Sequence, residues 1–438
     1  MRTTFIVVVV FLSALSEAQS SAQSPAREQP ARAPVMTVEE IEREAMANNP
    51  EIRAAQRRVG VTKARISGAG ALDDPLLMYR NWGTPLSKPW DWNQSQQMFM
   101  VQQTLPGPGK RAARTEVVNR QAAENDAQVE VLRREIGVRV RKAYYDLLRS
   151  ADEHRIHDRQ MELSKQALQS ATVKYTIGRV PQQDVLKAQI AMTRLADHLV
   201  TLDQEEESAR SELNALMGRD PGAPLEVVGH YGGARVLPSL LELERIALEQ
   251  RPELKAIAAT SGVAEAQLLL ARKAYTPEFT VAGGYMLMPS GSLFRNNYMA
   301  ELTVSLPWLN RRKHESEIKE AEAAASVVHS EHDAEVNAAF LEIQQALIRA
   351  CAAERSLKLY SGTLRPQAEA AFQSASAAYQ HDRTDFLNLI DSQNLLLEVE
   401  TAYFKAAANF DERIAELERA IGASLSAAAP AATVTEVK

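Results

Sequence analysis

The sequence has 438 residues and a formal net charge of −6, and aromatic residues make up only 6% of it. Long stretches are rich in Ala, Glu, Gln, Leu and Arg. This composition, with few aromatic side chains, is typical of extended helices that pack through narrow apolar seams and not of large globular cores. The mild acidity and the lack of a strong basic patch argue against nucleic-acid binding. Cys351 is the single cysteine, so no intrachain disulfide forms and we expect no lipoprotein anchor.

The N-terminal segment has the pattern of a secretory signal peptide. Arg2 precedes an apolar run at residues 5–15, and small residues follow, with cleavage points after Ala18 or Ala22. About ten apolar residues are too few to cross a bilayer as a helix, so we predict a signal peptide at residues 1–22. Residues 23–36, rich in Ser, Ala, Gln and Pro, and residues 423–438, rich in Ala, are predicted to be a disordered linker and a disordered tail.

The chain is a tandem duplication, with a first repeat at residues 37–236 and a second at residues 237–422. The segment Asn49-Pro50-Glu51-Ile52 corresponds to Arg251-Pro252-Glu253-Leu254, and residues 175–189 align without a gap on residues 379–393. A period this long indicates one structural unit that is built twice. In each repeat we expect a helix of about 35 residues, two strands, a helix of nearly 70 residues, a turn and a second helix of about 35.

Two strands are predicted in each repeat, near residues 76–82 and 98–105 and, more clearly, at residues 279–287 and 298–306. Apolar residues occupy every second position of the last segment: Tyr298, Ala300, Leu302, Val304 and Leu306. A period of two indicates a strand with one apolar and one polar face. No segment after the signal peptide has about 18 uninterrupted apolar residues, so we expect strands and not helices to cross the membrane.

The number of strands sets the number of copies. Four strands cannot close a membrane barrel, because the smallest such barrels have about eight and an open sheet edge in lipid leaves backbone groups unpaired. Two copies would give a narrow barrel filled by side chains, whereas three give twelve strands and a lumen. We therefore predict a homotrimer that shares one twelve-stranded β-barrel. Trp90 and Trp92, between the first two strands, fit either the outer lipid surface or a soluble hairpin loop.

The rest of each repeat is predicted to be coiled-coil helix, which makes the fold mainly α with a long helical barrel. A helix of about 68 residues runs roughly 100 Å, and Pro366 is expected to kink it. Apolar residues recur at alternating steps of three and four along its seam: Phe340, Ile343, Leu347, Ala350, Leu357, Leu364, Ala368, Ala371, Ala375 and Ala378.

Two motifs, one in each repeat, carry a family resemblance. Tyr175-Thr176-Ile177-Gly178-Arg179 precedes Asp184-Val185-Leu186-Lys187-Ala188-Gln189, and Tyr379-Gln380-His381-Asp382-Arg383 precedes Leu389-Ile390-Asp391-Ser392-Gln393. With the element order and the duplication, these motifs make the chain from about residue 37 to residue 422 resemble the TolC-type outer-membrane efflux family. The segment Leu105-Pro106-Gly107-Pro108-Gly109-Lys110-Arg111 is similar to the subgroup that serves heavy-metal efflux pumps.

The resemblance implies a passive exit duct in the cell outer membrane with a large periplasmic part. Three protomers form the barrel and a twelve-helix tunnel that narrows at its periplasmic tip. The implied partners are a periplasmic adaptor (membrane fusion) protein, an inner-membrane pump of the RND type and outer-membrane lipid, and no cofactor is implied. The adaptor is expected at the tip turns Gly178-Arg179 and Asp382-Arg383. Asp382 replaces the family's second turn glycine, so the two grooves are expected to bind the adaptor unequally. The substrate stays open between metal ions, drugs and secreted peptides.

The family's closing network is carried over to the tip by position. Asp184 and Tyr379 match it, whereas its arginine aligns with Thr384, and Arg383 is the expected substitute one residue away. Of the two aspartates that ring the family's aperture, Asp391 matches and the other has become Asn388. In a trimer three carboxylates then replace six, which weakens cation binding and charge repulsion at the constriction.

Two groups of residues allow a metal-binding interpretation. One contains histidines three apart on a helical face, at His154 and His157 and at His329 and His332. The other contains the soft thioethers of Met98, Met100, Met286 and Met288. We favour solvated helix surface for the histidines and strand packing or lumen lining for the methionines, and predict no metal site.

Other classes of protein fit less well. Gly107-Pro108-Gly109-Lys110 lacks the spacing and the hydroxyl of a phosphate loop, and no Ser-His-Asp or Cys-His arrangement stands out, so no enzyme is expected. The alternative is a periplasmic or cell-surface coiled-coil scaffold, or an adaptor protein, without a pore. A scaffold does not need two strands of membrane length in each half, and an adaptor has one central hairpin and no tandem duplication.

Overall fold

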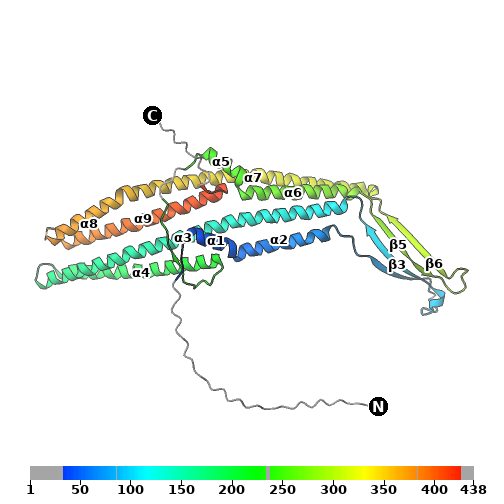
Figure 1. Ribbon diagram of the computed structural model, residues 1–438, viewed down its shortest axis with the longest axis horizontal. Coiled ribbons are helices and arrows are strands. Elements are labelled where there is room, and N and C mark those ends of the chain that lie inside the picture. Colours follow the sequence, from blue (N-terminus) through cyan, green and yellow to red (C-terminus); the bar gives the residue numbers. More distant parts are fainter. Residues whose placement is uncertain (1–32, 85, 233–236, 382, 426–438) are drawn as a thin grey trace, which may run out of the picture.

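The protein is an elongated bundle of helices with a four-stranded sheet at one end (Figure 1). The computed structural model describes residues 33–84, 86–232, 237–381 and 383–425. The expected signal peptide, residues 23–32 of the expected linker and residues 426–438 of the expected tail lie outside the described residues. Most described residues are helical, as the composition predicts.

The two repeats have nearly the same order of elements. The first contains β1 (Val35–Met36), α1 (Val38–Asn48), α2 (Pro50–Ala69), β2 (Leu76–Trp82), a 3₁₀ turn (Trp92–Gln94), β3 (Gln96–Leu105), α3 (Lys110–Thr176), α4 (Gln182–Met217) and β4 (Glu226–Val227). The second contains α5 (Leu240–Gln250), α6 (Pro252–Arg272), a 3₁₀ turn (Lys273–Tyr275), β5 (Phe279–Leu287), β6 (Asn296–Val304), a 3₁₀ turn (Pro307–Asn310), α7 (Arg311–Leu359), a π turn (Tyr360–Leu364), α8 (Arg365–Gln380) and α9 (Phe386–Ile421).

The first predicted helix of each repeat is broken in two at a proline. Pro50 and Pro252 begin α2 and α6, where a missing backbone N–H costs nothing because the first helical N–H groups have no partner inside the helix. The residue before each proline holds the C-terminal end of the last helix of its repeat. Asn49 Nδ2 donates to the carbonyl of Leu216 at 2.9 Å, and Arg251 Nη1 donates to the carbonyl of Ala420 at 3.0 Å.

A glycine at each of these helix ends completes the same contact. Gly218 ends α4 and Gly422 ends α9, both with φ of 72°, a conformation that glycine adopts without strain. A Cβ at Gly218 would lie 2.8 Å from the carbonyl oxygen of Asn48, and one at Gly422 would lie 2.7 Å from Arg251 Cα. The two repeats therefore share individual backbone contacts as well as the order of their elements.

The sheet joins the two repeats. Its strand order is β2-β3-β5-β6 and every pair is antiparallel, so β3 of the first repeat pairs with β5 of the second. Strands β2 and β5 have the predicted bounds, whereas β3 begins two residues early and β6 lies two residues earlier than expected. Within the described residues, the edge strands β2 and β6 each pair on one side only.

A tight junction connects the sheet to the helices. Gly107 lies between β3 and α3. A Cβ at this position would lie 2.4 Å from the carbonyl oxygen of Pro277, just before β5. One turn further on, Lys110 Nζ lies 2.9 Å from the carboxylate of Glu278. Gly107 is therefore required by the close approach of the two repeats, and Gly109 by its φ of 80°.

Three expectations need correction. Residues 35–36 were expected in the linker, but β1 pairs in parallel with β4, because the amides of Glu226 and Val228 donate to carbonyls of residues 34 and 36. Leu425 was expected in the tail, yet it is buried in the apolar core of the second repeat. The first predicted helix of each repeat is two helices. The helical segment Pro252–Tyr275 is long and apolar enough to cross a membrane by length and composition. It is not an uninterrupted apolar run, since Glu253, Lys255 and Glu265 lie within it, and its α6 part packs along α3 and α7 in the bundle.

Pro366 interrupts the long second-repeat helix, as predicted. Proline cannot donate to the carbonyl four residues earlier, so the helix widens into the π turn at Tyr360–Leu364 before α8 continues.

Substitution of either repeat glycine should destabilise the fold more than substitution of a loop glycine. Gly218→Ala and Gly422→Ala each force alanine into a left-handed backbone, which costs about 1–2 kcal/mol, and add a clash that costs about 1–3 kcal/mol more. Gly83 has a similar φ of 77° but open space around it, so Gly83→Ala is the control with only the backbone cost. Guanidinium denaturation in detergent measures the difference, and equal loss in all three variants would contradict the packing argument.

Candidate functional site

The first helical hairpin turns at Gly178, at the end of the rod away from the sheet (Figure 1). Gly178 has φ of 73°, and its amide donates to the carbonyl of Tyr175 at 2.9 Å. The amide of Arg179 donates to the carbonyl of Lys174 at 2.8 Å. Open space surrounds Gly178, so the backbone conformation, and not packing, requires glycine here.

The second hairpin repeats this turn with different residues. The amide of Arg383 donates to the carbonyl of Ala378 at 2.8 Å, the bond equivalent to that between Arg179 and Lys174. Asp385 caps α9 by accepting from the amide of Asn388 at 3.1 Å. Asp382 lies outside the described residues, so the inequality of the two docking grooves stays a prediction.

An apolar cluster holds the two hairpins together close to their tips. Tyr379 is only 6% exposed, and its ring lies edge-on against Phe386 with centroids 5.8 Å apart. Small residues of the first hairpin let α8 and α9 approach. The cluster consists of Ala167, Ala171, Ala188, Tyr379, Phe386, Leu389 and Ile390.

Lys174 is a tip residue that the sequence did not reveal. Its ammonium nitrogen lies 3.9 Å from the centre of the Tyr379 ring and donates to the Tyr379 carbonyl at 3.4 Å. It thereby links the end of α3 to the end of α8. The first-repeat motif begins one residue later, at Tyr175, and the equivalent of Lys174 in the second repeat is Ala378. No repeat pattern could therefore have identified it.

The predicted gate residues lie at the tip. The expected hydrogen bond between Tyr379 and Asp184 is absent from the described residues of the single protomer. The Tyr379 hydroxyl is buried and has no hydrogen-bond partner among the described residues, and none of them forms an ion pair with the half-buried Asp184. Thr384 Oγ1 accepts from the Asn388 side chain at 2.9 Å. Arg383 is exposed in the turn.

Asp391 is also exposed, on the second turn of α9, and it takes no part in the apolar cluster. The protomer thus places a carboxylate on the surface close to the tip, which is what a ring of aperture carboxylates requires. The ring itself needs further copies of the chain.

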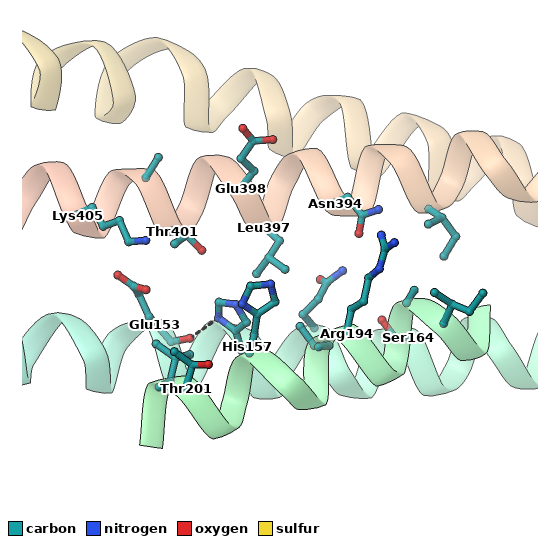
Figure 2. Close-up of a pocket in the computed structure, with 18 of the residues that line it drawn as sticks. Glu153, His157, Ser164, Arg194, Thr201, Asn394, Leu397, Glu398, Thr401 and Lys405 are labelled. Carbon is teal, nitrogen blue, oxygen red and sulfur yellow. Dashed lines mark hydrogen bonds between the residues drawn. The ribbon is translucent and has the colours of Figure 1, made fainter. Parts of the chain in front are cut away.

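A groove of about 810 Å³ lies further up, where α3, α4 and α9 come together (Figure 2). Glu153 and His157 of α3 face Lys405 and Thr401 of α9 across it (Figure 2). His157 Nδ1–H donates to the carbonyl of Glu153 at 2.8 Å. Burial lowers the pKa of His157 below its ordinary value, so the ring is neutral at pH 7.

The histidines do not form a metal site among the described residues. His154 bonds to Asp158 and Asp203, each at 3.1 Å, while His157 points into the groove, and no group of three ligating residues exists there. The expected solvated surface is wrong for His157, which is buried. The ring of His157 packs beside His198 of α4, with centroids 6.0 Å apart, and the sequence pattern of α3 alone did not show this contact.

The sheet has one apolar face that is largely exposed. Tyr298 is 91% exposed, and Leu77, Phe99, Val281 and Leu302 share its face. Strands in lipid carry such a face outward.

Aromatic side chains lie at both ends of the strands. Trp90 is exposed in the loop after β2, and Trp308 is exposed in the 3₁₀ turn between β6 and α7. Two aromatic levels separated by the length of the strands match the two interfaces of a bilayer.

A helical rod with a membrane-length sheet at one end and a narrow tip at the other is the architecture of an outer-membrane channel protomer. The chain belongs to the outer membrane efflux protein family, whose model matches residues 42–219 and 243–423, one match in each repeat. The TolC-type resemblance and the outer-membrane location with a large periplasmic helical part are thereby confirmed.

Two solved channels and one curated relative show how far the similarity extends. The chain is 22% identical over 382 residues to the cobalt-zinc-cadmium resistance protein CzcC of Cupriavidus metallidurans, covering 86% of this chain and 88% of that protein. Its fold is similar to CusC (TM-score 0.74, 16% identity, 88% of this chain and 92% of that one). It is also similar to the outer membrane channel CmeC of Campylobacter jejuni (TM-score 0.74, 13% identity, 93% of each chain).

Replacing Lys174 by Met should loosen the contact between the hairpins while the helix stays intact. The variant loses a cation–π contact worth about 0.5–1 kcal/mol, so amide hydrogen exchange at residues 379–390 should become roughly two- to fivefold faster. Lys165→Met removes a matched lysine whose ion pair with Glu162 is exposed, and should leave exchange at these residues unchanged. The same exchange in both variants would show that Lys174 does not hold the tip.

Proposed function

We propose that the chain is one protomer of a homotrimeric exit duct, which passively conducts substrates from an inner-membrane RND-type pump and a periplasmic adaptor through the outer membrane. The observation that carries the proposal is the open four-stranded sheet with an apolar exposed face. A lipid-exposed edge leaves N–H and C=O groups unpaired at a cost of several kcal/mol each. Pairing β6 of one copy with β2 of the next removes every edge.

Three copies satisfy this requirement with an open pore. Twelve strands enclose a lumen, whereas eight would be filled by their own side chains. A duct of this kind needs neither a catalytic group nor a cofactor, because energy comes from the pump. A coiled-coil scaffold or an adaptor without a pore would instead leave the exposed apolar face of the sheet in water.

The helical tip is the proposed site of adaptor docking. Exposed apolar side chains flank the first turn on both helices, namely Val173 and Ile177 before it and Leu186 and Ile190 after it. Apolar residues at helical spacing offer a groove for the helical hairpin of an adaptor. Gly178, Arg179, Asp382 and Arg383 are the turn residues that this hairpin meets.

The same tip is the proposed gate. A buried hydroxyl without a partner costs about 1–3 kcal/mol, and Tyr379 has one. A hydrogen bond from Tyr379 to Asp184 in the closed trimer, supported by Arg383 and Thr384, would remove that cost. Opening then separates these residues as the hairpins move apart, a switch between two packed arrangements.

Metal ions are the proposed substrate class. The similarity to a cobalt-zinc-cadmium resistance protein supports this, and so does the resemblance of residues 105–111 to the heavy-metal subgroup. At the aperture, three copies of Asp391 would meet the ion, with Asn388 in place of a second carboxylate ring.

The first test is single-channel conductance of the purified protein in a planar bilayer. Wild type should conduct weakly, and the double variant Asp184→Ala, Tyr379→Phe should conduct several-fold more because the gate loses both partners. Asp158→Ala with Tyr360→Phe makes the same two changes away from the tip and should behave as wild type. Folded protein with no conductance in any form would overturn the duct and favour the scaffold.

The second test concerns the aperture ring. Asp391→Asn should weaken the block of single channels by divalent cations because it removes three carboxylates per trimer, while Asn388→Asp should strengthen it by adding three. Equal block in wild type and both variants would place the constriction elsewhere.

A further inference from the structure

Five of the twelve methionines of the chain lie on one face of the four-stranded sheet. Met78 pairs with Met100 across β2 and β3, and Met98 pairs with Met286 across β3 and β5. Gly284 pairs with Met100 on one side and with Met299 on the other. Directly opposed residues point to the same side of a sheet, so all five thioethers share a face.

This face is the one that turns away from lipid. The opposite face carries Tyr298, Leu302 and the other exposed apolar side chains described above. On the methionine face, Met98 is 7% and Met100 2% exposed, because neighbours on the same face cover them. Met78, Met286 and Met299 remain partly exposed, so the cluster is reachable from the lumen side.

The sulfur atoms are directed toward polar groups. The side-chain amide of Gln96 donates to the sulfur of Met286 and lies 4.0 Å from the sulfur of Met98. Arg80 Nη2 lies 3.6 Å from the sulfur of Met78. The sulfur atoms of Met98 and Met286 thus both face the side-chain nitrogen of Gln96. A cation could bind both sulfur atoms at this position if the Gln96 side chain changed rotamer.

A glycine keeps the cluster compact. A Cβ at Gly284 would lie 2.8 Å from Met100 Cγ, so the Met100 side chain rests directly on the β5 backbone. The same Cβ would also clash with the carbonyl oxygen of Phe99 and with Met100 Cα, so the close approach of β3 itself requires glycine at this position.

The charges on this face disfavour a hard cation. Glu301 of β6 is the one carboxylate among the described strand residues that share the face, and Arg80 of β2, at the other edge of the sheet, adds a positive charge to it. Divalent ions such as Mg²⁺ and Ca²⁺ need several oxygen ligands, whereas thioethers select soft ions.

We propose that Met78, Met98, Met100, Met286 and Met299 form a transit site for soft monovalent metal ions, silver(I) or copper(I), on the lumen wall of the barrel. The proposal rests on the proposed duct for the direction in which this face points. Binding of the metal is independent of conductance.

Silver(I) binding to the purified full-length protein in detergent tests the site, since silver(I) has no redox chemistry to confuse the result. Wild type, titrated with silver nitrate in chloride-free buffer against free methionine as competitor, should bind silver at least tenfold more tightly than Met98→Leu with Met286→Leu. Leucine is close to methionine in volume, so the fold should survive. Met46→Leu with Met161→Leu, both on helices, is the matched control and should bind as wild type.

A further variant separates ligation from general disturbance of the sheet. Gln96→Ala removes the amide but no sulfur, and should bind silver at least as tightly as wild type. Equal binding by wild type and the Met98, Met286 double variant would overturn the site, and so would loss of binding in Gln96→Ala. Zinc(II) at the same concentration should not displace silver, and displacement would contradict a soft site. A protein that conducts but binds no silver disproves only this inference, whereas one that binds silver but does not conduct disproves the duct.

Discussion

The pairing of backbone hydrogen bonds in lipid is the constraint on which this structure depends. Each protomer presents four antiparallel strands with two open edges, and neither edge can face hydrocarbon unpaired. The strands run into α3 and α7 through short junctions, one of them fixed by the contact of Gly107 with Pro277. In the proposed trimer, closing the sheet between copies would also close the helices into a ring, so that one requirement would produce both the barrel and the tunnel.

The two repeats have nearly the same order of elements because of the duplication, but individual contacts differ between them. Asn49 and Arg251 hold equivalent helix ends, but only the buried Arg251 carries a charge there, and it also binds Glu342 of α7 at 2.7 Å. In the sequence, Asp382 stands where the first repeat has Gly178. The two kinds of groove between hairpins of the proposed trimer are therefore predicted to differ for a partner that binds there.

Much of the fold could be predicted from the sequence because its signals are periodic. The alternation in β6, the heptads of α7 and the aligned Tyr175 and Tyr379 motifs each report a regular element or its copy. Contacts without a period could not be predicted. The pairing of β1 with β4, the burial of His157 beside α4 and the contact of Lys174 with Tyr379 depend on how distant segments meet. Four methionines were considered as soft ligands and assigned to strand packing or lumen lining. The strand register shows that three of them, Met98, Met100 and Met286, share one face with Met78 and Met299.

The number of chains in the folded particle tests the central claim most directly. Native mass spectrometry of the detergent-solubilised protein, combined with a disulfide cross-link between single cysteines placed in β2 and β6 of a Cys351→Ser background, measures both the copy number and the closing contact. The account predicts a particle of three chains in which the cross-link joins different chains. A folded, detergent-free monomer, or a trimer in which β2 and β6 never cross-link between chains, would contradict it.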